Sequence, residues 1–334
     1  MSALEVRDLI VEYAQAHGRP YRAVESLTFS LEAGRTLALV GESGSGKSSV
    51  LKALSRLVTP ASGSILLDGR EKVRARQYRR AVQMVFQDPF ASLNPAHTVD
   101  HHLRRPLLAT GRANGGAAAD AGVAELLRQV NLTPAADVAR KRPHELSGGQ
   151  RQRVAIARAL APAPDVLLAD EPVSMLDVSI RLEILNLLDD LKRQRNLALL
   201  YVTHDLATAR HFSSEIMVMY RGQVVERGPS DEVILNPRHP YTQLLAAAAP
   251  RTGATREDVR AARQVRKDSR AQRDAERREI VVGEGCRFRP RCPFATSECA
   301  RRPPDVRIGP PAPDGGGHRV LCWLYGEGET AAHG

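Results

Sequence analysis

The stretch LALVGESGSGKSS, residues Leu37–Ser49, decides the fold, because a short apolar run passes directly into a glycine-rich loop and then into a helical pattern. It fits G-x-x-x-x-G-K-[ST], the pattern of a phosphate-binding loop. Glycines let consecutive backbone N–H groups turn toward a phosphate, and the helix that follows aims its positive end at it. The alternative is a glycine-rich turn that only caps a helix, and the strand–loop–helix setting disfavours it. The sequence therefore predicts a site for nucleotide phosphates.

Within this loop the residue types match separate tasks. Lys47 is placed to reach the outer phosphates, and the Ser48 hydroxyl can serve as a ligand of Mg²⁺. The residues expected to bind the nucleotide here are Gly41, Ser43, Gly44, Gly46, Lys47, Ser48 and Ser49.

A second apolar run ends in acids, in the sequence VLLADEP, residues 166–172. Asp170 is expected to hold Mg²⁺ through water, and Glu171 to orient or deprotonate the attacking water. An acidic pair after a strand would by itself be a charge pair at a helix N-terminus. Because a phosphate loop accompanies it, we interpret it as the catalytic pair.

The pattern around these motifs indicates an α/β fold with a mostly parallel sheet. Short, continuous apolar runs predict buried strands, and helical periods lie between them. The first 35 residues alternate in polarity, and this pattern predicts an N-terminal antiparallel β subdomain. The helical periods between about residues 90 and 160 predict a helical subdomain. The expected strands are Leu37–Val40, Val82–Phe86, Val166–Ala169 and Leu197–Val202; the expected helices include Lys47–Val58, Ala117–Val130, Gly148–Leu160 and Ile180–Arg195.

Composition narrows the class of protein. The chain has 334 residues, of which 43% are hydrophobic and 26% charged, as in a folded protein. Its net charge of +10 is concentrated toward the Arg-rich tail, and we expect no nucleic-acid partner. No apolar run is long enough to span a membrane and the start lacks a signal-peptide pattern, so we expect a cytosolic protein unless a partner brings it to a membrane.

The four cysteines, Cys286, Cys292, Cys299 and Cys322, all lie near the end of the chain. In a cytosolic chain, clustered cysteines are more often metal ligands than disulfides. The spacing C-x5-C-x6-C-x22-C matches neither paired zinc knuckles nor close-set ferredoxin runs, so it indicates only four thiolates in one small lobe. We expect that irregular lobe over residues 284–334, after a charged linker over residues 251–283.

The segment HELSGGQRQRVAIARAL, residues 144–160, resembles the signature motif of the ATP-binding cassette (ABC) family. The other family motifs are present in their usual order along the chain. Gln87 in VFQDP resembles the Q-loop glutamine, Asp177 in SMLD the D-loop aspartate, and His204 in VTHDL the switch histidine. The signature residues expected to contact the nucleotide of a partner subunit are Leu146, Ser147, Gly148, Gly149 and Gln150.

The resemblance implies roles for individual residues. Glu171, His204 and Gln87 would be catalytic, and Ser48, Gln87 and Asp170 would surround Mg²⁺. Asp177 would contact ATP. Tyr13 resembles the aromatic residue that stacks on adenine, with Tyr21 as the competing candidate. Two subunits would form a head-to-tail pair with ATP between the phosphate loop of one and the signature of the other.

Within that family, FQDPFASLNP, DEPVSMLDVS and NPRHPYTQLLAAAAP resemble the ATP-binding subunits of oligopeptide, dipeptide and nickel importers. This implies an ABC ATP-binding domain over residues 1–250, ATP and Mg²⁺ as ligands, two transmembrane permease subunits, a second ATP-binding subunit and an extracytoplasmic solute-binding protein. The subunit would sit at the cytoplasmic face of the bacterial inner membrane and hydrolyse ATP to drive uptake of peptides or related small solutes. The tail, GCRFRPRCPFATSEC and Cys322, resembles the C-terminal extension of the same group and implies a 4Fe-4S cluster.

Some alternatives stay open at this point. Zn²⁺ or unmetallated thiols could replace the iron–sulfur cluster, and a cassette ATPase acting on nucleic acid or ribosomes is the alternative function. An exporter is a third, disfavoured by the absence of a fused membrane span. Two departures from the family pattern, Met175 and Ser49, remove no catalytic group. The sequence identifies neither the solute nor whether the ATPase pair consists of identical chains.

Overall fold

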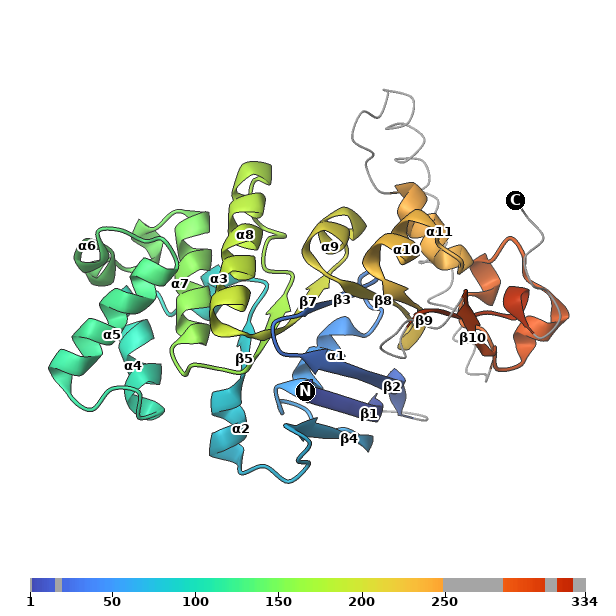
Figure 1. The fold of residues 1–334 in the computed structure, drawn as a ribbon, viewed down its shortest axis with the longest axis horizontal. Helices are drawn as coiled ribbons and strands as arrows, with labels where there is room; N and C mark the ends of the chain where they lie inside the picture. The colour runs from blue at the N-terminus through green and yellow to red at the C-terminus, as the bar shows by residue number, and fades with distance from the viewer. Residues whose placement is uncertain (1, 16–19, 249–284, 310–316, 327–334) are drawn as a thin grey trace. The chain divides into compact units, whose positions relative to one another are not determined.

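We analysed the fold in a computed structural model that describes residues 2–15, 20–248, 285–309 and 317–326 (Figure 1). The chain forms two compact units, Met1–Leu37 with Ser48–Thr203, and Ala38–Lys47 with His204–Gly334. The linker predicted over residues 251–283 lies outside the described residues.

The first unit begins with a three-stranded sheet built from β1 (Ser2–Tyr13), β2 (Tyr21–Glu32) and β4 (Ser62–Leu67) in the order β2-β1-β4. Strand β1 is antiparallel to both neighbours. Alternate side chains of β1, among them Leu4 and Val6, are fully buried, as the alternating sequence requires. The antiparallel β subdomain expected at the N-terminus is confirmed.

The same unit holds three parallel strands, β5 (Val82–Val85), β6 (Val166–Asp170) and β7 (Ala198–Thr203), with β6 in the middle. Every residue of β7 is buried, which explains its continuous apolar sequence. Because parallel strands end at the same edge of a sheet, the segments that follow β5 and β6 lie near each other. This edge carries the acidic pair that the sequence singled out.

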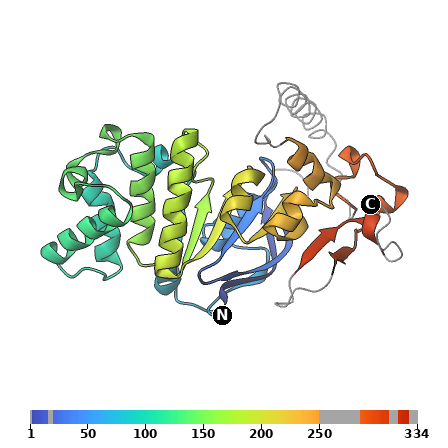
Figure 2. The ribbon, with the colours of Figure 1, turned by 45° about the horizontal axis from the view of Figure 1, so that its top comes forward.

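Helices fill the rest of the first unit, and those between Pro89 and Ser147 form the expected insertion. Figures 1 and 2 show them grouped beside α7 and α8. Helix α1 ends four residues before the expected Val58, and Arg56 follows with a left-handed φ of 57°. The helices are α1 (Lys47–Leu54), α2 (Ala75–Ala81), α3 (Pro89–Ser92), α4 (Val99–Ala109), α5 (Gly116–Gln129), α6 (Ala135–Arg140), η1 (Pro143–Glu145), α7 (Gly148–Leu160) and α8 (Val178–Arg195).

The second unit carries the strand order β10-β11-β9-β8-β3. Its elements are β3 (Thr36–Val40), α9 (Leu206–Phe212), β8 (Glu215–Tyr220), β9 (Gln223–Pro229), α10 (Ser230–Leu235), α11 (Pro240–Ala248), η2 (Arg289–Arg291), η3 (Ser297–Ala300), β10 (Asp305–Ile308), β11 (His318–Leu321) and η4 (Trp323–Tyr325).

The cysteine-bearing lobe is more regular than its sequence indicated. Strands β10 and β11 are antiparallel, and β11 pairs with β9 through Arg319 opposite Arg227 and Val320 opposite Glu226. A short strand that extends an existing sheet edge needs no large core of its own, and Val320 is fully buried there. The lobe expected to be irregular therefore contains one regular antiparallel pair of strands.

Among the residues that the structure describes, none of the helices combines the length and the apolar composition that crossing a bilayer requires.

Candidate active site

The phosphate loop lies between β3 and α1, and its glycines are required by its shape. Gly44 and Gly46 have φ angles of 82° and 108°, which side chains rarely adopt. A Cβ atom on Gly41 would lie 2.2 Å from the carbonyl oxygen of Met219 in β8. The loop therefore packs directly on β8, and only glycine fits at its first position.

Lys47, at the first turn of α1, folds back onto this loop. Its Nζ donates to the carbonyl oxygens of Gly41, at 2.6 Å, and Glu42, at 3.0 Å, and the residue is only 6% exposed. Ser43, Gly44 and Ser48 are exposed. The loop thus presents its outer face to a ligand while its carbonyl groups hold the lysine.

Tyr13, at the end of β1, lies beside the residue that follows the loop motif. Its hydroxyl donates to Ser49 Oγ at 3.3 Å. Tyr21 pairs with Tyr13 across β1 and β2 but is 44% exposed. Of the two tyrosines proposed for adenine, the structure links Tyr13 to the loop by a hydrogen bond.

Asp170 is the last residue of β6 and Glu171 follows it, and Gln87 follows β5 at the same edge of the parallel strands. Gln87 Nε2 donates to Glu171 Oε2 at 3.3 Å, and the Glu171 N–H donates to the Val202 carbonyl oxygen of β7 at 2.9 Å. Glu171 has a left-handed φ of 42°. Such a conformation costs on the order of 1 kcal/mol and persists only where the surroundings fix it. The carboxylate of Glu171 is therefore held in a defined place beside Gln87.

The signature segment caps α7. Ser147 Oγ accepts from the Gln150 N–H at 3.2 Å, and the Ser147 N–H donates to Gln150 Oε1 at 3.1 Å, which forms a capping box. A Cβ atom on Gly149 would lie 2.9 Å from Ile180 of α8. Leu146 is buried, whereas Ser147 is exposed. Because Ser147 exposes this end of α7 and the N-terminus of a helix favours negative charge, the segment is suited to bind an anion.

The residues that resemble the D-loop aspartate and the switch histidine lie at or next to the start of a helix. Asp177 is the N-cap residue of α8 and is exposed, between Met175 and Val178, which are 55% and 75% exposed. His204 directly follows β7 in the chain, and Asp205 caps α9 by accepting from the Ala207 N–H at 2.9 Å. His204 belongs to the second unit and Asp177 to the first.

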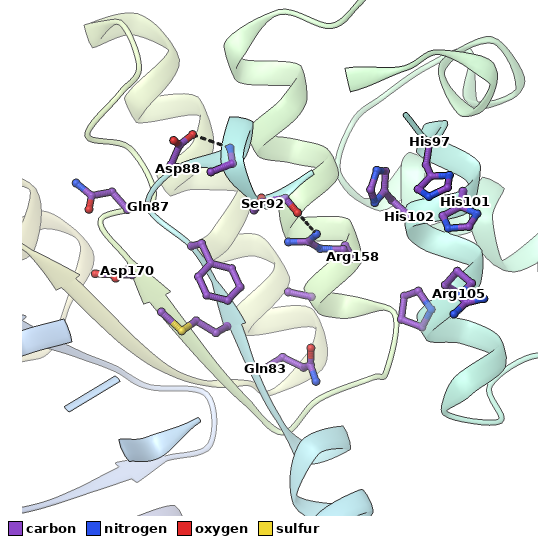
Figure 3. Close-up of a pocket in the computed structure, with 15 residues that line it drawn as sticks. Gln83, Gln87, Asp88, Ser92, His97, His101, His102, Arg105, Arg158 and Asp170 are labelled. Carbon is purple, nitrogen blue, oxygen red and sulfur yellow. Dashed lines mark hydrogen bonds between the residues drawn. The ribbon is translucent and has the colours of Figure 1, made fainter. Parts of the chain in front are cut away.

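A pocket of about 810 Å³ opens beside Gln87 in the first unit (Figure 3). Its lining includes Gln87, Asp88, Ser92, His97, His101, His102, Arg105, Arg158 and Asp170, and we call it the histidine pocket.

The histidines of this pocket form a cluster that the sequence analysis missed. The rings of His97 and His101 stack with centroids 3.9 Å apart, and His102 Nε2 lies 3.0 Å from the Asn94 carbonyl oxygen. Burial lowers the pKa of His102, and the positive charge of Arg158 lowers it further. Three histidines within six residues, HTVDHH, were the available signal.

The four cysteines lie in the C-terminal lobe as the candidate ligands of a metal centre. All are free thiols, and the Cys286 N–H donates to the Cys299 carbonyl oxygen at 2.9 Å. Burial raises the pKa of Cys322 to about 12, and the Cys286, Cys292 and Cys299 thiols raise it further. Within the described ranges, however, no group of three or more His, Cys, Asp or Glu side chains could hold a metal ion. The thiols are suitable in kind for a soft metal, but they do not converge to a coordination site.

Two further residues touch the phosphate loop and lie in none of the ABC motifs. Tyr241 Oη accepts from the Glu42 N–H at 2.9 Å, and Arg291 Nη1 donates to Glu42 Oε2 at 3.2 Å. They lie 199 and 249 residues from Glu42 in the chain. No local pattern signalled either contact, because only the tertiary fold brings these segments together.

The phosphate loop, the acidic pair after β6 and the capped helix of the signature segment define a P-loop ATPase. The family comparisons make this specific. Residues 24–174 match the family "ABC transporter", and residues 225–299 match "Oligopeptide/dipeptide transporter, C-terminal region".

Relatives and solved structures agree with these matches. The chain is 40% identical to the di/tripeptide transport ATP-binding protein DppF of Pseudomonas aeruginosa over 92% of this chain and 94% of that protein. It is 40% identical to the oligopeptide transport ATP-binding protein AppF of Bacillus subtilis, over 91% and 90% of the two chains. The dimeric ATP-binding cassette MJ0796 bound to ADP and Pi matches with a TM-score of 0.61 and 29% identity, over 68% of this chain and 98% of that one. The chain therefore belongs to the ABC transporter family, as an ATP-hydrolysing, ATP-binding subunit with an oligopeptide/dipeptide-type C-terminal region.

Proposed function

We propose that this chain is the motor subunit of a bacterial importer and that ATP hydrolysis on it drives uptake of peptides or related small solutes. The observation that carries the proposal is the likeness to a di/tripeptide transport subunit over 94% of that protein's length. The match to the oligopeptide/dipeptide C-terminal region supports it, because that region lies outside the ATPase motifs. The reaction consumes ATP, whereas the solute is handled by partner subunits.

We assign the steps on ATP to residues of the site as follows. Lys47 exchanges the carbonyl oxygens of Gly41 and Glu42 for the outer phosphates of ATP, because a charged phosphate is the stronger acceptor. Ser48, Gln87 and Asp170 would hold Mg²⁺, which neutralises charge on the phosphates when it is bound. Glu171 orients and deprotonates the attacking water, with Gln87 hydrogen-bonded to its carboxylate. His204 contacts the γ-phosphate.

A head-to-tail pair of ATP-binding subunits would complete each site. The exposed Ser147 at the N-terminus of α7 offers a hydroxyl and helix N–H groups to a nucleotide held by the partner. Exposed apolar side chains around Asp177 support a protein contact there: Met175, Val178 and Leu182 are 55%, 75% and 53% exposed. The dimeric state of the related cassette MJ0796 supports the same arrangement.

The histidine pocket is proposed as the groove that receives a helix of a transmembrane permease. It is bordered by Gln87, Asp88 and Ser92, which follow β5 in the chain. Gln87 lines the pocket and also hydrogen-bonds Glu171, so a helix seated there could act on the catalytic carboxylate. Two such permease subunits would hold this chain at the cytoplasmic face of the inner membrane. An extracytoplasmic solute-binding protein would deliver the solute to them from the other side.

We also propose that Cys286, Cys292, Cys299 and Cys322 bind a metal centre, either a 4Fe-4S cluster or Zn²⁺. The donor type and the hydrogen bond between the Cys286 and Cys299 backbones support this, whereas the present arrangement of the thiols does not converge to a site. No step of ATP hydrolysis is assigned to this centre.

A transport assay tests the proposed function. The gene for this chain would be deleted, and uptake of a radiolabelled dipeptide and a radiolabelled pentapeptide measured with wild-type and Glu171→Gln complementation. We expect uptake to return with the wild-type chain and not with the variant. If the deletion leaves uptake of both peptides unchanged, peptide import by this chain is contradicted. The ATPase activity of the purified chain shows separately whether it hydrolyses ATP.

A further inference from the structure

The segment that carries the first two cysteines, Cys286–Cys292 or CRFRPRC, packs against the phosphate loop within the second unit. Its Arg291 makes two hydrogen bonds to the carboxylate of Glu42, from Nη1 to Oε2 at 3.2 Å and from Nη2 to Oε1 at 3.5 Å. The Arg291 side chain is 1% exposed and that of Glu42 16%. A paired, two-pronged contact of this kind fixes orientation as well as charge.

Glu42 is the point at which several contacts on the loop meet. Its N–H donates to the buried Tyr241 hydroxyl, its carbonyl oxygen accepts from Lys47 Nζ, and its carboxylate binds Arg291. Any shift of Glu42 would therefore move the backbone that holds Lys47. Arg291 thus contacts the loop at the residue whose carbonyl oxygen holds Lys47 in the absence of ATP.

A second connection joins the same segment to the loop. Arg287 donates a hydrogen bond to the carbonyl oxygen of Arg221, and the next residue, Gly222, donates its N–H to the Ser45 carbonyl oxygen at 2.7 Å. Phe288, which follows Arg287 in the chain, is 1% exposed. It packs against Tyr220 and Tyr241, whose ring centroids lie 5.3 and 5.5 Å away. The segment is thus a built support of the phosphate loop.

The charge of Glu42 makes this support important for nucleotide binding. A carboxylate in a phosphate-binding loop repels the phosphates of ATP, and a partly buried charge is poorly screened by salt. Arg291 cancels that charge at hydrogen-bonding distance. We propose that Arg291 is a positioning residue for ATP binding, which holds the phosphate loop through Glu42 and neutralises the carboxylate there. The proposal rests on ATP binding by this chain and not on the identity of the solute.

The test measures binding of the non-hydrolysable analogue AMP-PNP with Mg²⁺ to the full chain by calorimetry, together with the KM for ATP and kcat. For R291Q we expect the Kd and the KM to rise about tenfold, with kcat at saturating ATP within about twofold of wild type. In the double variant E42Q/R291Q neither charge remains, and the Kd should return to within about threefold of wild type. R319Q is the matched control, because Arg319 pairs with Asp305 in the same lobe and should keep the wild-type Kd.

The proposal is overturned if folded R291Q keeps the wild-type Kd, if E42Q/R291Q binds as weakly as R291Q, or if R319Q loses affinity equally. If R291Q does not fold, R291K decides. Lysine keeps the charge but cannot form both hydrogen bonds, so we expect its Kd to rise about threefold. A wild-type Kd in R291K would then refute the positioning role.

Discussion

The side-chain amide of Gln87 donates a hydrogen bond to a carboxylate oxygen of Glu171 at 3.3 Å. The two residues are 84 positions apart in the chain and come together because β5 and β6 are parallel and adjacent. Gln87 also lines the histidine pocket. A residue on the pocket surface is therefore in direct contact with the proposed catalytic base.

We first predict the effect of removing that base. Glu171→Gln keeps the shape of the side chain but cannot accept a proton from water, so kcat should fall by about 10³-fold, at the strong end of general-base effects. Mg²⁺-dependent ATP binding should remain within a fewfold of wild type. Steady-state hydrolysis and equilibrium binding would be compared with the exposed control Glu125→Gln, and near-normal hydrolysis by Glu171→Gln would refute the assignment.

The second prediction separates the two tyrosines proposed for adenine. Tyr13→Ala should raise the Kd for ATP about tenfold, because stacking of an aromatic ring on a base contributes about 1–3 kcal/mol. Tyr21→Ala, on the neighbouring strand, should leave the Kd unchanged. If the loss of affinity follows Tyr21 instead, the adenine contact belongs to the second tyrosine.

The third prediction concerns the signature helix. Ser147→Ala removes the N-cap of α7 and should lower the free energy of unfolding by about 1 kcal/mol. It should also lower ATP hydrolysis about tenfold, since a charge-assisted contact to the partner's nucleotide would be lost. Thr98→Ala removes the N-cap of α4 and serves as the control. Equal loss of hydrolysis in both variants would show that Ser147 acts only on stability.

The fourth prediction is a pH dependence of stability from His239. Burial lowers its pKa from 6.5 to about 3, and its Nδ1 accepts from the Tyr241 N–H at 3.1 Å, which requires that nitrogen to be unprotonated. Between these two pKa values the unfolded chain binds the extra proton and the folded chain does not. The free energy of unfolding is therefore not reduced by His239 above about pH 6.5. It decreases as the pH falls below that value, by roughly 2 kcal/mol between pH 7 and pH 5.

Urea unfolding at pH 7 and pH 5 measures this change. His239→Gln should reduce the loss of stability on acidification, whereas the exposed control His211→Gln should leave it unaltered. An acid dependence that is identical in all three proteins would assign the effect to other groups.

The fifth prediction concerns the cysteine lobe. Anaerobically purified protein should contain either iron with inorganic sulfide and absorb near about 400 nm, or zinc without colour. Cys299→Ser should lower the metal content, because it removes one of the four donors. Metal-free wild-type protein that still binds ATP would leave the lobe with four thiols and no metal role.

Much of the fold could be predicted from the sequence. The strands β3, β5, β6 and β7 lie at largely apolar segments, and α7 has the bounds expected from its period. The phosphate loop and signature were recognisable because their chemistry lies in consecutive residues. The regular strands β10 and β11 escaped prediction, because their pairing depends on an available edge at β9 and not on their own composition.

The sequence by itself determined the phosphate loop, the acidic pair, the signature and the class of protein, since each of these is a short-range pattern of residue types. Only the tertiary structure decided which distant residues act on them. Gln87 reaches Glu171 through strand order, and Arg291 reaches Glu42 across 249 residues through packing of the C-terminal segment. Neither contact leaves a periodic or spacing signal, because an ion pair or hydrogen bond between remote segments depends on how the chain folds back and not on what lies beside each residue.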